Sequence, residues 1–157
     1  MNVDITVFFD GFHGDTSQTF FVGAVVSIVL QSPCLFDKSV VQDLPGVDLV
    51  NTTNLALKAS IEACGPNIPF ANIGRIIHEI ASQRGYSVNS QLTGHGIGRV
   101  FHRPPWILHH SLFCNSFRKI SLLSALSEND EPGVMLPGHV FTIEVRMPFT
   151  VGSSHST

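Results

Sequence analysis

Apolar and polar side chains alternate with a period of two near the N-terminus, which is the pattern of a β-strand with two unlike faces. Val3, Ile5 and Val7 lie on one side of this strand, and Asp4 and Thr6 lie on the other. An Asp-Gly dipeptide follows, and it favours a two-residue type I′ turn because both residues accept the positive φ angles that this turn needs. The pattern therefore predicts a β-hairpin.

The register of this hairpin decides where its carboxylates lie. With a two-residue loop, Asp4 pairs with Ser17 and Thr6 with Asp15. Asp4 and Asp15 then become diagonal neighbours on one face, roughly 7–8 Å apart at the backbone, whereas an odd loop would place them on opposite faces. Carboxylates this close repel unless one is protonated or a cation lies between them. The strand pattern alone favours a solvated outer face over such a site, because a polar face is ordinary for an antiparallel pair.

Two helices are predicted next. Asn51 or Thr52 is expected to cap the first helix, which runs to about Cys64 and stops at the Gly-Pro dipeptide that follows. The inner stripe of this helix is predicted to contain Leu55, Ala59 and Ala63. The second helix is expected to have Asn72 as its cap and Gly85 as its stop. Its apolar stripe, at i, i+3, i+4 and i+7, consists of Ile73, Ile76, Ile77 and Ile80.

Short strands and loops are predicted in the rest of the chain. Residues 86–91 are expected to form a strand, residues 103–110 a loop because they contain two adjacent prolines, and residues 139–145 a strand. Three glycines around His95 leave room for a close approach of the backbone. Together with an apolar strand at 25–30, the pattern indicates one α+β domain with an antiparallel sheet and without a linker.

Composition narrows the class of protein. The 157 residues are 43% hydrophobic and 13% charged, which is typical of a single globular domain. A net charge of −3 gives no basic footprint, so nucleic acid is not an expected partner. The longest apolar run, 20–30, is too short to span a membrane. Three scattered cysteines indicate neither a disulfide framework nor a thiolate zinc site, and they fit a reduced intracellular compartment.

Four residues have side chains suited to a divalent cation. Asp4, Asp15, His95 and Glu144 supply the oxygen and imidazole ligands that such ions accept. Two metal ions that share carboxylates would suit the activation of water for hydrolysis. The spacing of these residues does not by itself establish that they converge.

Three motifs carry a family resemblance. The first is Asp-Ile-Thr-Val followed by Asp-Gly-Phe-His-Gly-Asp-Thr-Ser, the second is Gly-His-Gly-Ile-Gly with Phe-His shortly after it, and the third is Pro-Gly-His-Val-Phe-Thr-Ile-Glu. They occur in this order, and with the helical stretch between them they extend over more than half of the chain. In these features the chain resembles the type I methionine aminopeptidases. The paired His109 and His110, with residues 129–133, resemble the eukaryotic organellar forms most.

The resemblance implies the "pita-bread" α+β fold, incomplete at both ends of this chain, and removal of the initiator methionine by attack of a metal-bridging hydroxide. It implies two divalent ions (Co, Mn, Fe or Zn), with Asp4 on the first metal, Asp15 bridging both, and His95 and Glu144 on the second. The implied substrates are the N-terminal methionyl peptides of nascent proteins, with the ribosome as a further partner. The implied compartment is the cytoplasm or the mitochondrion.

Further roles follow from matched positions in the motifs. His102 matches a histidine that contacts the substrate near the scissile amide and stabilises the tetrahedral intermediate. Phe101 matches an aromatic wall of the methionine pocket, and Thr6 matches a threonine beside the metals. Glu144 would also take part in proton transfer.

The chain departs from the family in several places. No acidic residue follows Glu144, where the family has a last metal-bridging glutamate, and Val145 replaces a proline. Residues 26–48 and 112–127 look inserted, and residues 146–157 form an unrelated tail. Residues 1–157 are therefore expected to be a single partial catalytic domain from a truncated or aberrantly spliced chain.

Two other functions stay open on the sequence. The chain is alternatively an inactive fragment or pseudoenzyme of the same fold, which binds polypeptide or a partner without cleaving it. An Xaa-Pro peptidase of the same fold fits less well, because the Gly-His-Gly-Ile-Gly context resembles the methionine enzymes more closely.

Overall fold

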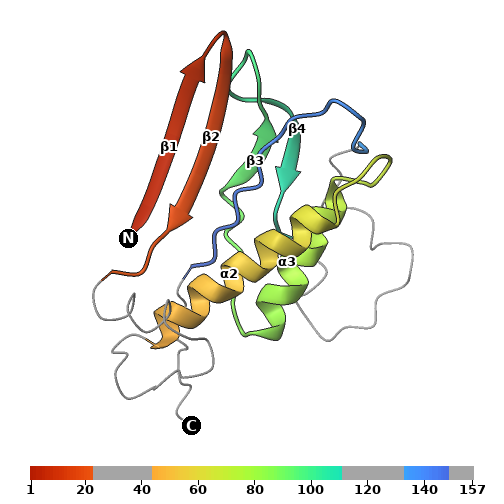
Figure 1. The fold of residues 1–157 in the computed structure, drawn as a ribbon. Coiled ribbons are helices and arrows are strands. Elements are labelled where there is room, and N and C mark those ends of the chain that lie inside the picture. The colour runs from red at the N-terminus through yellow and green to blue at the C-terminus, as the bar shows by residue number, and fades with distance from the viewer. Residues whose placement is uncertain (23–43, 111–132, 149–157) are drawn as a thin grey trace, which may run out of the picture.

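The computed structural model describes residues 1–22, 44–110 and 133–148. The elements in chain order are β1 (Asn2–Phe9), β2 (Phe12–Thr19), α2 (Leu44–Glu62), α3 (Ala71–Gln83), β3 (Thr93–Gly96) and β4 (Arg103–Leu108) (Figure 1). Within these ranges, no helix is both long and apolar enough to cross a membrane. The strand expected at 25–30, the stretch 112–127 and the tail beyond residue 148 lie outside the described residues.

The N-terminal hairpin has the predicted register. β1 and β2 are antiparallel, with Thr6 opposite Asp15 and Asp4 opposite Ser17. The two turn residues have φ angles of 49° and 81°, both positive as a type I′ turn requires. The face that carries Asp15 therefore also carries Asp4, and β1 contributes apolar side chains to the opposite face. Several side chains of that opposite face are exposed, namely Ile5, Val7, Phe9 and Phe12.

β3 and β4 form a second antiparallel pair. The loop predicted at 103–110 was wrong, because Arg103–Leu108 is a strand. The register of the pair shifts between His95 and Gly96, and the two prolines of β4 lie in this irregularity. A bulged edge strand tolerates proline, because the missing N–H groups are not needed for the ladder.

Residues 139–145 run alongside β3 without forming a regular strand, so the predicted strand is only partly present. The Thr142 N–H donates to the His95 carbonyl at 2.8 Å, and the Ile97 N–H donates to the Val140 carbonyl at 3.1 Å. The strand predicted at 86–91 is absent from the structure of that segment. This pairing brings Glu144 next to the glycine-flanked His95.

α3 buries Ile73 and Ile77 of the predicted stripe, and Ile76 and Ile80 are partly buried. Gly85 has a left-handed conformation after the end of the helix. The predicted cap was wrong. Phe70 occupies the cap position without a side-chain hydrogen bond, and Asn72 lies within the helix, where its Oδ1 accepts from Arg75 at 2.8 Å. The spacing of the isoleucines therefore predicted the position of this helix better than the expected Asn72 cap did.

α2 begins at Leu44, seven or eight residues before the predicted caps. Pro45 lies in its first turn, where a missing N–H is not costly. The predicted inner stripe was also wrong, since Leu55 is 45% exposed. The buried face consists instead of Val47, Thr52, Ala56 and Ser60. These are mostly small side chains, which allow α2 to pack closely against α3.

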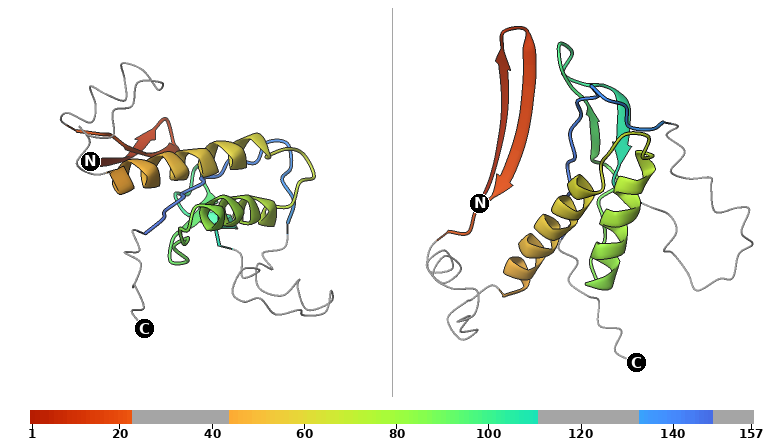
Figure 2. Two further views of the ribbon diagram at one scale, coloured as in Figure 1. Left: turned by 90° about the horizontal axis from the view of Figure 1, so that it is seen from below. Right: turned by 45° about the vertical axis from the view of Figure 1, so that its right-hand side comes forward.

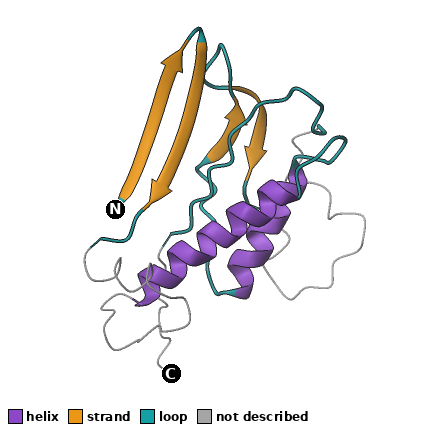
Figure 3. Cartoon of the chain, viewed as in Figure 1, coloured by secondary structure: helices purple, strands orange, loops and turns teal. Residues whose placement is uncertain are grey.

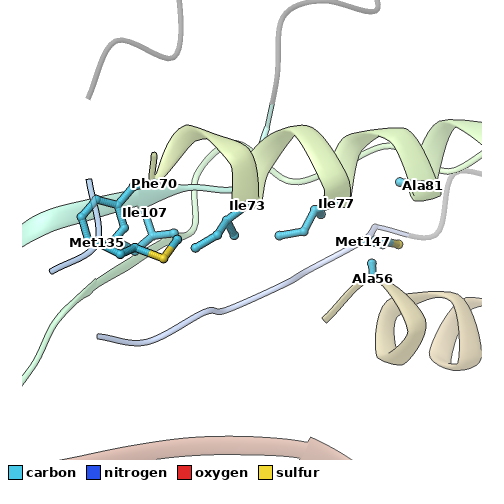
Figure 4. Packing of buried hydrophobic residues seen from close by; sticks show 8 residues of the cluster. All are labelled: Ala56, Phe70, Ile73, Ile77, Ala81, Ile107, Met135 and Met147. Atoms are coloured by element: carbon cyan, nitrogen blue, oxygen red, sulfur yellow. The ribbon is translucent and has the colours of Figure 1, made fainter. Parts of the chain in front are cut away.

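The hydrophobic core lies between the two helices, β4 and the segment after residue 133 (Figure 4). Its buried members are Ala56, Phe70, Ile73, Ile77, Ala81, Ile107, Met135 and Met147. Figures 2 and 3 show α2 and α3 next to each other, with the strands to one side of the helix pair. The core thus holds β3, β4 and residues 139–145 in place behind the candidate site.

Candidate metal site

Three of the predicted ligands come together between the hairpin, β3 and the segment beside β3. Asp15, His95 and Glu144 each offer one ligand atom, and these atoms lie within 4.8 Å of one another. The His95 Nε2 is 3.8 Å from Asp15 Oδ2 and 3.1 Å from Glu144 Oε1. The side chain of His95 is 3% exposed, that of Asp15 is 16% exposed and that of Glu144 is 35% exposed. The site is therefore closed around the imidazole and open to solvent beside Glu144.

The hydrogen bonding of His95 fits a metal ligand. Its Nδ1 lies 3.2 Å from the Gly96 carbonyl oxygen. A carbonyl only accepts hydrogen bonds, so Nδ1 carries a hydrogen, and Nε2, which faces Asp15 and Glu144, is the ring nitrogen placed to bind a cation. Three acceptor atoms that face one another need a proton or a cation between them. Two carboxylates and a neutral imidazole are a suitable donor set for a divalent transition-metal ion.

Asp4 stands outside this group. It shares a face with Asp15, as the register predicts, but its side chain is exposed. The carboxylate of Asp15 accepts instead a hydrogen bond from the Thr6 hydroxyl at 3.3 Å. Among the described residues, the ligand set for one cation is assembled, and Asp4 as a ligand of another stays a prediction.

Phe101 and His102 lie directly against His95. The ring centroids of His95 and His102 are 4.3 Å apart, and those of His95 and Phe101 are 5.6 Å apart. His102 is exposed and Phe101 is half-buried. The two residues that the resemblance assigns to the substrate are therefore neighbours of the candidate metal ligands, and their roles remain predictions.

Two residues around Glu144 had not been predicted to belong to the site. Thr142 Oγ1 accepts from the His95 N–H at 3.0 Å and donates to Glu144 Oε1 at 2.7 Å. His109 Nε2 accepts from the Glu144 N–H at 3.2 Å. The alternation of residues 139–145 places Thr142 and Glu144 on one side, which is a usable signal for Thr142. His109 is one of two adjacent histidines at the end of the predicted loop 103–110, and the sequence linked this pair only to the organellar forms of the family, not to the site.

The surroundings of His109 keep it neutral. Its side chain is buried, and burial lowers its pKa to about 4. The Leu92 backbone opposes this shift by favouring the charged ring, whereas the charge of neighbouring His110 lowers the pKa further. A neutral ring is also what the hydrogen bond from Glu144 requires, because Nε2 must keep its lone pair.

The hairpin is attached to the loop after β3 mainly through His13, and Arg99 of that loop lies 4.8 Å over the Phe12 ring. The His13 N–H and its ring Nδ1 both lie 2.9 Å from the Gly98 carbonyl oxygen, so both donate to it. The His13 ring also stacks at a tilt against Phe101, with 5.4 Å between ring centroids. This contact fixes the strand that carries Asp15 next to the loop that carries Phe101.

The fold and the donor set together define the class as a metalloprotein of the α+β type. Comparison with known proteins is more specific. The chain belongs to metallopeptidase family M24, whose model matches residues 1–154.

Several curated relatives are methionine aminopeptidases. The chain is 36% identical over 153 residues to methionine aminopeptidase 1D, chloroplastic/mitochondrial, of Arabidopsis thaliana, covering 98% of this chain and 33% of the relative. It is 37% identical over 144 residues to methionine aminopeptidase 1B, chloroplastic, of the same plant, covering 92% and 30%. The chain thus spans about a third of the length of the curated relatives it matches.

Solved structures agree with this family. A methionine aminopeptidase of Rickettsia prowazekii has a TM-score of 0.66 and 29% identity, covering 93% of this chain and 46% of that one. A methionine aminopeptidase of Thermotoga maritima gives the same TM-score at 23% identity, which shows the fold alone. The predicted pita-bread fold is confirmed for the described part of the chain.

Proposed function

We propose that this chain provides a metal-dependent aminopeptidase site that removes the N-terminal methionine from polypeptides. The observation that carries the proposal is the convergence of ligand atoms from Asp15, His95 and Glu144 within 4.8 Å, in a chain of a metallopeptidase family. These residues lie on three segments that are far apart in the sequence. Their convergence is what a catalytic metal site requires.

The three residues would hold a divalent cation, which when bound supplies Lewis-acid polarisation of a carbonyl and a lowered pKa of water. Glu144 is the most exposed of the three and is placed to accept a proton from water and to deliver it to the leaving amine. His102 is exposed beside His95 and would donate a hydrogen bond to the oxygen on which charge develops. Phe101 would supply an apolar wall for the methionine side chain.

The proposed substrates are methionyl N-termini of nascent proteins, and an association with the ribosome stays a prediction. The proposed compartment is intracellular. Relatives with mitochondrial and chloroplastic names support an organelle among the predicted compartments.

An assay of the purified 157-residue chain tests the proposal. Co²⁺, Mn²⁺, Fe²⁺ or Zn²⁺ is added, and release of methionine from a Met-Ala-Ser peptide is followed. We expect turnover that EDTA abolishes. A chain that neither turns over the peptide nor binds any of these ions in calorimetry would contradict the proposed function.

A second candidate is a polypeptide-binding protein of the same fold without catalysis. It is supported by the exposed position of Asp4 outside the group of three ligands. The group of three then holds one cation, whereas a two-metal site would activate water with two. Binding of a cation and of the Met-Ala-Ser peptide without any cleavage would favour this candidate over the first.

A further inference from the structure

Glu144 is held from two directions by groups that do not belong to the set of three ligands. Its carboxylate Oε1 accepts from the Thr142 hydroxyl at 2.7 Å. Its backbone N–H donates to His109 Nε2 at 3.2 Å. The side chain is also 35% exposed, so water would compete for the carboxylate if these contacts were absent.

The Thr142 hydroxyl accepts one hydrogen bond and donates another. It accepts from the His95 N–H at 3.0 Å, so its single hydrogen is free to point at Glu144. One hydroxyl therefore connects the backbone of the imidazole ligand to the carboxylate of another ligand. The Thr142 N–H adds to this connection by donating to the His95 carbonyl at 2.8 Å.

His109 is a rigid acceptor for the Glu144 backbone. Its side chain is 1% exposed, in contact with the interior of the domain. The ring cannot turn to water, and it meets an N–H of Glu144 with the nitrogen that carries a lone pair. The backbone at Glu144 is thus fixed independently of its carboxylate.

We propose that Thr142 and His109 are positioning residues that hold Glu144 in the geometry needed for a cation before the cation binds. This inference rests on the metal site of the proposed function. Neither residue is one of the three ligands. Partners of metal ligands fix ligand orientation, and their loss typically lowers metal affinity by about 10–100-fold.

Thr142→Val tests the hydroxyl, because valine has nearly the same shape and cannot accept from His95 or donate to Glu144. We expect Mn²⁺ or Co²⁺ to bind the purified chain roughly 10–100-fold more weakly in calorimetry. The visible absorption of bound Co²⁺ should also change, since it reports coordination geometry. Thr142→Ser keeps the hydroxyl and should restore both readouts to near wild-type values.

Thr53→Val is the matched control. The Thr53 hydroxyl donates to the Leu49 carbonyl at 2.8 Å on α2, away from the ligands. It should leave cation affinity unchanged. Thermal unfolding of each metal-free variant shows whether any loss of affinity is only a loss of fold.

A second pair of variants tests the imidazole. His109→Gln keeps an acceptor for the Glu144 N–H, and His109→Met fills similar space without a comparable one. We expect His109→Met to weaken cation binding by roughly tenfold or more, and His109→Gln to recover most of it. This pair decides the matter if Thr142→Val does not fold.

The outcomes separate the two proposals. A wild-type chain that binds none of the ions overturns the metal site, and with it this inference. A wild-type chain that binds them while folded Thr142→Val and His109→Met bind equally well overturns the positioning role alone. Equal losses in Thr142→Val and Thr142→Ser would also overturn it, because the hydroxyl would then not be the cause.

Discussion

The three candidate ligands differ in how strongly their surroundings restrain them. His95 is buried and is bonded through its backbone and its ring. Glu144 is more exposed but is held by Thr142 and His109. Among the described residues, the Asp15 carboxylate accepts a hydrogen bond from the Thr6 hydroxyl at 3.3 Å and lies 3.8 Å from His95 Nε2. We therefore expect Asp15 to adjust most when an ion binds.

Asp15→Asn should reduce cation affinity by more than about a hundredfold. Loss of a residue that only hydrogen-bonds to a ligand typically lowers metal affinity by about 10–100-fold, and a ligand contributes more. Calorimetry with Mn²⁺ measures this loss. Asp10→Asn is the matched control, since it removes a carboxylate from the same hairpin and Asn-Gly also suits the turn. Unchanged affinity in Asp15→Asn would contradict its role as a ligand.

The buried histidine predicts a pH dependence of stability in the metal-free chain. His109 has a folded-state pKa of about 4 against an ordinary value of 6.5, so between these values the unfolded chain binds a proton that the folded chain does not. The free energy of unfolding should then fall by about 3 kcal/mol as the pH drops from 6.5 to 4. Urea denaturation in EDTA measures it, and His109→Gln should show a shallower slope. Parallel slopes for the two chains would refute this assignment.

The sequence predicted the ligands of the site but not the residues that hydrogen-bond to them. Asp15, His95 and Glu144 were predicted ligands, and the structure brings them together. Thr142 and His109 were not, because a hydrogen bond to a ligand's backbone or carboxylate has no motif of its own. Such partners depend on the register of segments that lie dozens of residues apart.

At the scale of the elements, neighbouring backbone approaches the glycine-flanked strand β3 closely. A side chain added at Gly94 would collide with the Thr142 carbonyl oxygen and would lie 3.1 Å from the Ile107 Cβ. The predicted close approach of backbone around His95 is therefore present. It is also what allows residues 139–145 to run beside β3.

Gly94→Ala should destabilise the chain by about 1–3 kcal/mol or more, because the backbone at Thr142 must move. Cation affinity should fall with it, since Glu144 is two residues further on. Gly65→Ala is the control, because its added Cβ would make an ordinary contact 3.6 Å from Ile68 and should change stability by only about 0.5 kcal/mol. Thermal unfolding checks both variants. A Gly94→Ala chain as stable as the control would show that the backbone at Thr142 moves at little cost in stability.

Local patterns predicted some elements well and missed others for physical reasons. The hairpin was predictable because alternation and an Asp-Gly turn act within twenty residues. β4 was missed because its two prolines are tolerated only where the partner strand bulges. The start of α2 was missed because its leading proline reads as a breaker and its buried face is made of small and polar residues.

At the scale of the whole molecule, the ligands join parts that are otherwise lightly connected. The hairpin packs on the rest of the described chain mainly through His13 and its neighbours, while its apolar outer face is exposed. The helices, β4 and residues 133–148 share one core without it. Membership of the metallopeptidase family was recognisable because three motifs occur in the family's order, whereas the packing between hairpin and core could not be predicted from them.

The position of Asp15 and Glu144 on either side of this junction has a consequence for chain entropy. A cation bound by both would close a loop of about 130 residues. The cost of closing a loop rises only slowly with its length, and clips that close long loops stabilise most in principle. The ion would then act as a removable cross-link between the hairpin and the core of the folded chain, quite apart from any chemistry it supports.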